Sequence, residues 1–243
     1  MKYILIVGAK SDIAKELARV YAKAGYALIL AARDHASLSS FQNDLQVRYG
    51  IDVQLKELDI INTQTHATFY AALEPKPYGT IVAVGYLGEQ EKAQQNWCEA
   101  ENILQVNFFG PLSLLNDIAQ DYEVKKEGFI VGISSVAGDR GRQTNYFYGA
   151  SKAGFSTYLS GLRNRLAKYH VQVLTVKPGF VATKMTEHLE LPSKLTAQAD
   201  EVAQAIFTAQ QKGKDVVYVK LIWRFIMLAI IHIPEKVFKK MKL

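Results

Sequence analysis

The sequence predicts one α/β domain in which a parallel β-sheet carries helices on both faces. Short apolar runs of strand length alternate along the chain with longer stretches in which apolar residues recur at helical spacing. No linker, repeat or low-complexity segment interrupts this alternation. The 243 residues, 49% of them hydrophobic, are enough to bury one large core. The expected architecture is therefore a single doubly wound parallel sheet.

The first expected strand, residues 3–7, is a continuous apolar run, as a strand covered on both faces should be. It ends at Gly8. A helix follows and stops at Gly25, because apolar residues recur along it at helical spacing: Ile13, Leu17, Val20 and Ala24. A second apolar run, residues 26–32, indicates the next strand, and a polar helix then leads to Gly50.

The later elements alternate in the same way. A third strand is expected at residues 52–58, and the helix after it ends at Leu73, before a turn that contains Pro75 and Pro77. The remaining expected strands and helices are strands 80–84, 129–133 and 171–176 and helices 99–121 and 146–169.

Charge and cysteine content narrow the class of protein. The net charge of +6, from 29 basic and 23 acidic residues, suits an anionic cofactor or an anionic surface. Zinc-finger spacing and basic repeats interleaved with aromatic residues are missing from the sequence, so a nucleic-acid partner is not expected. The single cysteine, Cys98, excludes an intramolecular disulfide and favours a reducing compartment. The first residues resemble a strand rather than a cleavable leader, which indicates a cytoplasmic protein.

The turn after the first strand is a candidate anion site, since free N–H groups and the helix dipole favour a pyrophosphate at a helix N-terminus. The candidate cofactor-binding residues here are Gly8, Lys10, Ser11, Asp12 and Ile13. Asp12 suits the dipole as a first-turn carboxylate but would repel a phosphate, so its side chain is expected to point away from the cofactor. On this turn alone, a purely structural glycine stop is an equal alternative.

The end of the second strand indicates which dinucleotide binds. An acidic residue there would accept the ribose 2′-hydroxyl of NAD, but the chain has Ala31, Ala32 and Arg33. Arg33, helped by Lys10, would pair with a 2′-phosphate. NADPH is therefore preferred to NADH, and the alternative is a solvated arginine in a loop.

A candidate catalytic site follows the strand at residues 129–133. Ser135 stands at the end of this strand, and Tyr148 and Lys152 fall one turn apart on the next helix. The lysine ammonium would favour the phenolate and lower the pKa of Tyr148. Such a group can transfer a proton in alcohol and carbonyl chemistry. Tyr and Lys at this spacing alone are also compatible with an ordinary solvated helix face.

The order and spacing of Ser135, Tyr148 and Lys152 resemble those of the short-chain dehydrogenase/reductase family. The resemblance implies a Rossmann-type fold in which Ser135 positions a carbonyl oxygen, Tyr148 donates a proton and Lys152 holds the ribose. It also implies that Asn107 helps to hold the lysine through water and that Asp59 contacts the adenine. The segment that would meet the nicotinamide contains Pro178, Gly179, Val181 and Thr183.

The chain departs from the family pattern in two places. Asp12 and Ala14 stand where the family has glycines in the first turn. Residues 82–85 occupy the place of the family's Asn-Asn-Ala-Gly segment, and of that segment only Gly85 is kept. Family members often pair into homodimers or homotetramers through the helices expected here at 99–121 and 146–169.

The chain ends in an unusual segment, which leads us to divide it into a dinucleotide-binding and catalytic part, 1–220, and a C-terminal extension, 221–243. Residues 221–233 are apolar apart from Arg224 and His232 but too short to span a bilayer. The lysines that follow would let the extension meet anionic lipid at the inner face of a membrane: Lys236, Lys239, Lys240 and Lys242. Packing against the domain or a second subunit is the alternative.

Short segments are similar, within this family, to reductases of lipid-linked keto-sugars: residues 8–13, 86–88, 134–140, 185–189, 223–225 and 232–234. The similarity implies an NADPH-dependent reductase of a lipid-linked or sugar ketone that serves a cell-surface polysaccharide. A generic small-carbonyl or 3-ketoacyl reductase is one alternative. A catalytically silent NADP-sensing or scaffold protein is another, suggested by Asp12 and the missing asparagines. No metal site is expected.

Overall fold

The computed structural model describes residues 1–187 and 189–241; His188 and the predicted lipid-contacting Lys242 lie outside them. Its centre is a seven-stranded sheet with the order β3-β2-β1-β4-β5-β6-β9, and every neighbouring pair in it is parallel. The strands are β1 (Tyr3–Val7), β2 (Ala27–Ala32), β3 (Val53–Glu57), β4 (Gly79–Val82), β5 (Phe129–Ile133), β6 (Gln172–Pro178) and β9 (Val216–Val219). The expected doubly wound parallel sheet is therefore confirmed.

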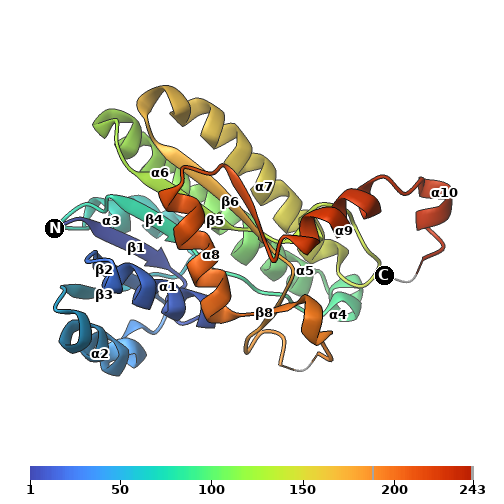
Figure 1. The fold of residues 1–243 in the computed structure, drawn as a ribbon, viewed down its shortest axis with the longest axis horizontal. Helices are drawn as coiled ribbons and strands as arrows, with labels where there is room; N and C mark the ends of the chain where they lie inside the picture. Colours follow the sequence, from blue (N-terminus) through green and yellow to red (C-terminus); the bar gives the residue numbers. More distant parts are fainter. Residues whose placement is uncertain (188, 242–243) are drawn as a thin grey trace.

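Helices cover both faces of this sheet (Figure 1). The α-helices are α1 (Asp12–Lys23), α2 (Ser39–Tyr49), α3 (His66–Ala71), α4 (Gln90–Gln95), α5 (Trp97–Leu104), α6 (Gly110–Lys125), α7 (Tyr146–Leu166), α8 (Ala199–Gln211), α9 (Ile222–Ile231) and α10 (Glu235–Phe238). The shorter helical segments are His35–Leu38, Thr63–Thr65, Gln105–Phe109, Val136–Gly138, Ala167–Tyr169 and Ser193–Leu195.

Alternation along the strands divides the core into two layers. On β1, Ile4 and Ile6 belong to the layer beneath α1, α2 and α8, whereas Leu5 and Val7 belong to the layer beneath α6 and α7. Because successive side chains point to opposite faces, a strand between two helical layers must be apolar throughout. This requirement explains why the first two strands are visible in the sequence as unbroken apolar runs.

The expected helix at residues 99–121 is wrong as one continuous helix. α5 and α6 are joined by a π-helical turn, Gln105–Phe109, in which the Gly110 amide donates to the Gln105 carbonyl. Pro111 follows directly and has no amide to continue the ordinary pattern. A Cβ at Gly110 would lie 2.2 Å from the Ile60 carbonyl oxygen, so the chain approaches its neighbour closely at this joint.

The strands after β6 were not expected from the sequence. β9 is a four-residue strand at the sheet edge, beside β6, and most of it is exposed or half-buried. β7 (Phe180–Ala182) and β8 (Thr196–Gln198) form a separate parallel pair of three residues each. Strands this short, at an edge or outside the main sheet, lack the long apolar run that identifies the central ones.

The last residues form an arm that projects from the sheet and its covering helices. Figure 1 shows α9 and α10 reaching away from the domain, on the side opposite the N-terminus. In residues 1–187 and 189–241, none of the helices combines the length and the apolar character needed to cross a bilayer. We call residues 221–241 the C-terminal arm.

Candidate active site

Two adjoining cavities open at the carboxyl ends of the strands, around the place where the strand order reverses between β1 and β4. This is where open α/β sheets bind ligands. The first cavity, of about 350 Å³, lies at the turn after β1, and the second, of about 280 Å³, lies in front of β5 and α7. They share a wall, made of Lys10, Ser11, Ala83, Val84 and Gly85.

Ser135, Tyr148 and Lys152 all line the second cavity. Ser135 follows β5 and caps the short helix Val136–Gly138, accepting a hydrogen bond from the Ala137 amide at 3.1 Å. Tyr148 and Lys152 stand in the first two turns of α7. The structure thus brings together three side chains that the sequence separates by up to 17 positions.

Burial is the largest influence on the pKa values of Tyr148 and Lys152. It raises the pKa of Tyr148 to about 12, although the hydrogen-bonding Ser135 hydroxyl lowers it in part. Burial also lowers the pKa of Lys152 to about 7. The Lys152 ammonium donates to the Ile133 carbonyl at 3.1 Å and lies 5.7 Å from the centre of the Tyr148 ring. The expected lowering of the Tyr148 pKa by Lys152 is therefore not found, and loss of hydration on burial raises this pKa instead.

Asn107 lies behind the wall of the site, in the π-helical turn, and is fully buried. Its amide nitrogen donates to the carbonyls of Tyr86 and Ile103 at 2.7 and 2.8 Å, and its oxygen accepts from the Tyr86 amide at 3.1 Å. These bonds fix the backbone next to Gly85. A Cβ at Gly85 would lie 3.7 Å from the Asn107 oxygen and 4.0 Å from the Lys152 nitrogen. A water-mediated contact between Asn107 and Lys152 stays a prediction.

The turn after β1 has the geometry that a pyrophosphate requires. Gly8 has a φ of +82°, and a Cβ there would lie 2.9 Å from the Val84 amide nitrogen. Ser11 caps α1 and accepts from the Ala14 amide at 3.2 Å. The lack of a side chain at Gly8 and the N-terminus of a three-turn helix therefore leave a cradle that suits an anion.

The charged residues around the first cavity make contacts that the sequence did not reveal. Lys10 forms an ion pair with Asp34 at 2.8 Å, and this pair lowers the pKa of Asp34. Arg33 is exposed at the rim of the same cavity, and Asp59 lines it from the end of β3. The help that Lys10 would give to Arg33 thus competes with the contact to Asp34.

Asp12 connects the two sides of the site. Its carboxylate accepts a hydrogen bond from the Lys184 amide at 2.9 Å. Asp12 and Ile13 line the second cavity together with Pro178, Gly179, Val181 and Thr183. The first turn of α1 is thereby tied to the segment that follows β7.

Sequence reasoning missed several lining residues. Met185 and Thr186 border the second cavity, and the Met185 methyl group would lie 3.2 Å from a Cβ at Gly85. The Trp223 indole of α9 packs so closely on Gly179 that a Cβ there would come within 2.0 Å of it. Spacing alone could not have placed Trp223, which lies more than 40 positions along the chain from Gly179.

The comparisons with known proteins identify the family. The model for the short chain dehydrogenase family matches residues 2–193. An uncharacterized oxidoreductase of Mycobacterium tuberculosis is 35% identical over 241 residues, which cover 98% of this chain and 96% of the relative. The chain therefore belongs to the short-chain dehydrogenases, a family of oxidoreductases.

Solved structures share the same fold. A short-chain dehydrogenase from Sphingobium yanoikuyae, in complex with NADPH, has a TM-score of 0.84 at 23% identity, covering 94% of this chain and 92% of that one. The bulky-bulky ketone specific alcohol dehydrogenase from Comamonas testosteroni has a TM-score of 0.82 at 22% identity, covering 97% and 96%. At these identities the likeness concerns the fold.

Proposed function

We propose that the protein is an NADPH-dependent ketone reductase with Ser135, Tyr148 and Lys152 as its catalytic residues. The observation that carries the proposal is the position of these three side chains in a cavity that adjoins the α1 turn. A dinucleotide could then lie with its pyrophosphate at the turn and its reactive ring beside Tyr148.

Two observations support NADP(H) as the cofactor. Arg33 stands at the end of β2, on the first cavity, where a 2′-phosphate would need a cationic partner. The Sphingobium neighbour, which has the same fold, is described in complex with NADPH.

The reaction converts a C=O group to CH–OH. NADPH, held by residues of the two cavities, would supply the hydride that the carbonyl carbon gains and would be left as NADP⁺. The Ser135 hydroxyl orients the carbonyl oxygen, and the Tyr148 phenol, which its raised pKa keeps protonated at neutral pH, donates the proton that this oxygen gains. Lys152, with a pKa near 7, can return a proton toward Tyr148 for the next cycle.

The substrate we propose is a lipid-linked or sugar 2-ketone. The segments 8–13, 86–88, 134–140 and 185–189, together with parts of the C-terminal arm, resemble decaprenylphosphoryl-2-keto-erythro-pentose reductase. The Comamonas neighbour is described as specific for bulky ketones. Several apolar side chains border the second cavity: Ile13, Ile133, Val181 and Met185.

We also propose the setting in which the reductase works. Residues 1–220 would act as one dinucleotide-binding and catalytic unit, with 221–243 as its extension. Copies would pair through the helices of residues 99–121 and 146–169, which form α5, α6 and α7, into a homodimer or homotetramer. The enzyme would be cytoplasmic, and the extension would bring it to the inner face of the membrane.

Cofactor titration followed by turnover tests the proposal. The protein should bind NADPH more tightly than NADH, measured by nicotinamide fluorescence. Arg33→Ala should weaken NADPH binding by about tenfold or more and leave NADH binding unchanged. Tyr148→Phe should keep NADPH binding but lower turnover of a keto-sugar by about 10³-fold.

Arg48→Ala is the matched control, because Arg48 is exposed and pairs with Asp44 on α2, away from both cavities. It should bind both cofactors like the wild type. Failure to bind either cofactor would favour the scaffold alternative. Equal turnover by wild type and Tyr148→Phe would remove Tyr148 as the proton donor, and activity confined to small soluble ketones would indicate a generic carbonyl reductase.

A further inference from the structure

The C-terminal arm carries apolar side chains on two opposite faces of α9. The inner face packs on the domain through Trp223, which is 4% exposed, and Met227, which is fully buried. At 3.6 residues per turn, Leu221, Phe225 and Leu228 lie on the other side of the helix. Phe225 is 62% exposed and Leu228 is 57% exposed. With the flanking Ile222 and Ile231, they form a mainly apolar outer face, into which helical spacing also brings the exposed Arg224 and His232.

The inner face is fixed firmly enough to hold the outer face in place. The Trp223 indole donates to the Leu195 carbonyl at 3.0 Å and meets Phe180 edge to face at 5.2 Å. Arg140 fastens the far end of α9, because its guanidinium donates to the carbonyls of Ile230, Ile231 and Ile233 at 2.7 to 2.9 Å. The exposed apolar face is therefore a built surface and not a loose tail.

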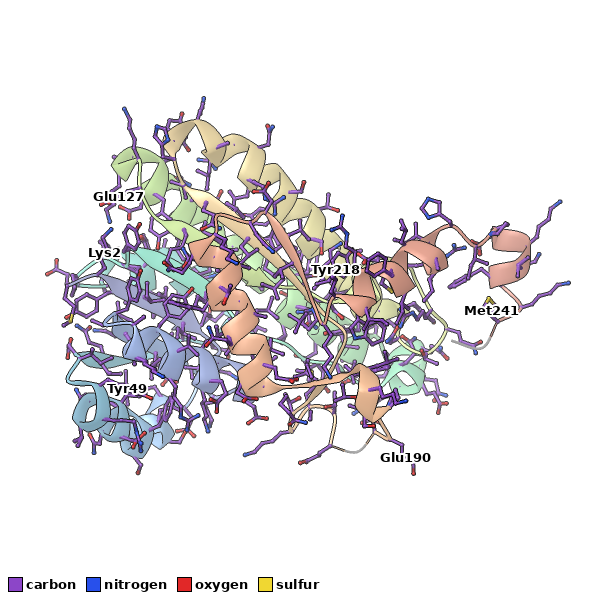
Figure 2. All side chains as sticks on the ribbon, viewed as in Figure 1. Lys2, Tyr49, Glu127, Glu190, Tyr218 and Met241 are labelled. Carbon is purple, nitrogen blue, oxygen red and sulfur yellow. The ribbon has the colours of Figure 1, made fainter. Side chains whose placement is uncertain are left out.

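The charge around this face is strongly positive. Glu235, the one acidic residue of the C-terminal arm as described, is paired with Arg140 at 2.8 Å. Arg140 also lies over the Phe238 ring, 3.8 Å from its centre. The basic residues of the arm stay exposed: Arg224, Lys236, Lys239 and Lys240. Figure 2 shows side chains with nitrogen tips pointing outward from the end of the arm, around the labelled Met241.

We infer that the C-terminal arm is a docking surface for an anionic lipid bilayer. An apolar helix face next to exposed lysines matches an interface in which acyl chains lie below negatively charged headgroups. The ten residues of α9 extend about 15 Å, half the thickness of a bilayer core, so the helix would lie in the plane of the surface.

A second copy of the chain is a poorer match for this face. Symmetric pairing would place the same patch, with the same excess of positive charge, on both subunits. An anionic surface attracts these positive charges, whereas a second arm carries the same positive charges and would repel them. The choice of a lipid surface thus rests on charge as well as on apolar area.

Docking would bring the active site to the membrane. Trp223 rests on Gly179, and Arg140 belongs to the segment that begins at Ser134, so the arm touches two segments next to the second cavity. A bilayer under α9 would lie close to the entrance used by a lipid-linked ketone. This consequence rests on the proposed function, while the docking itself does not.

Flotation of the full-length chain with vesicles tests the inference. The protein should float with equimolar phosphatidylcholine and phosphatidylglycerol, and less with phosphatidylcholine alone. Phe225→Glu/Leu228→Glu should abolish flotation. Replacing Lys236, Lys239 and Lys240 by Ala should weaken binding on the order of a hundredfold, since each lysine near an anionic surface contributes about fivefold.

Two control variants match these changes. Val47→Glu/Val124→Glu also places two acids at exposed apolar helix positions, and Lys23→Ala/Lys212→Ala/Lys214→Ala removes three exposed lysines elsewhere. Both should float like the wild type, and circular dichroism should show every variant folded. The inference is overturned if Phe225→Glu/Leu228→Glu floats normally. It is also overturned if the wild type stays unbound, and a dimer that this variant dissociates in sedimentation would then assign the face to a second copy of the chain.

Discussion

The two cavities of the active site are enclosed in different ways. The first is shaped by backbone at the carboxyl ends of the central strands β1 and β4. There Gly8 approaches the Val84 amide nitrogen, and neither backbone segment has room to move. The second is bordered by side chains from segments after β6, with Met185 near Gly85, and Trp223 packs on its lining residue Gly179. The shape of the first cavity therefore depends on a glycine, which has no side chain to occupy the space. The shape of the second depends on side chains that come from distant parts of the chain.

This difference predicts different tolerance to change. Backbone in a buried parallel sheet cannot yield, so a clash there cannot be relieved by a second substitution. A clash with a side chain can be relieved by trimming that side chain. Substitutions around the first cavity, where the cofactor would bind, should therefore weaken binding. The second cavity, where the substrate would bind, can be reshaped by paired substitutions.

The largest effect is expected from Gly179→Ala. The new methyl group would lie within about 2 Å of the Trp223 indole, which must move and lose its hydrogen bond to the Leu195 carbonyl. We expect a loss of about 3 kcal/mol in the free energy of unfolding, measured by urea denaturation. Adding Trp223→Ala should cost less in this background than in the wild type.

Two other glycines serve as comparisons for the double-mutant cycle of Gly179→Ala and Trp223→Ala. Gly161 lies in α7 with open space around a Cβ, so Gly161→Ala should be neutral or stabilising by up to about 1 kcal/mol. Gly8→Ala should not be rescued by Val84→Ala, because the Val84 amide nitrogen stays in place. If the losses in free energy of unfolding for Gly179→Ala and Trp223→Ala add up, the Trp223 side chain does not limit the space at Gly179.

The same difference explains how far the sequence could predict the molecule. The central strands were predicted to within two residues at each end, because a strand between two helical layers must be apolar throughout. The predicted cofactor and catalytic residues gather around the two cavities, with Asn107 behind the wall. Order and spacing located those that follow a strand or open a helix, whereas the family resemblance indicated Asp59, Asn107 and the segment 178–183.

The parts that were missed depend on long-range contacts. The break at Gly110 follows from the nearby Ile60 carbonyl, which the local sequence does not reveal. The high pKa of Tyr148 follows from the burial that the folded chain imposes on it, whereas the sequence showed only the neighbouring lysine. The two faces of α9 became distinct only when Trp223 was placed on Gly179.

The effect expected in the pH dependence of stability is smaller per pH unit. Burial lowers the pKa of Lys152 from 10.5 to about 7, so the unfolded chain binds more protons than the folded chain between these values. Stability should therefore rise with pH from 7 toward 10, by up to about 1.4 kcal/mol per pH unit for this group. Above pH 10, the raised pKa of Tyr148 acts in the opposite direction.

Denaturation at several pH values checks this expectation. Lys152→Met keeps an unbranched side chain without the charge, so its stability should depend less steeply on pH than that of the wild type. Lys212→Met removes an exposed lysine and should leave the pH dependence unchanged. Parallel curves for wild type and Lys152→Met would show that burial does not depress the Lys152 pKa.

The smallest effect should come from the polar link between the two cavities. Asp12 belongs to the α1 turn, and its carboxylate holds the Lys184 amide of the substrate side at 2.9 Å. Asp12→Ala should cost about 1 kcal/mol in stability and raise the KM for the ketone several-fold, because the segment after β7 loses an anchor. Asp12→Asn keeps an acceptor oxygen and should stay close to the wild type in both measurements.

Asp12→Ala should bind NADPH as tightly as the wild type or more tightly, since the substitution removes a carboxylate from the surroundings of the pyrophosphate. If Asp12→Ala instead weakens NADPH binding and leaves the ketone KM unchanged, Asp12 belongs to the cofactor side alone, and the two cavities are not linked through it.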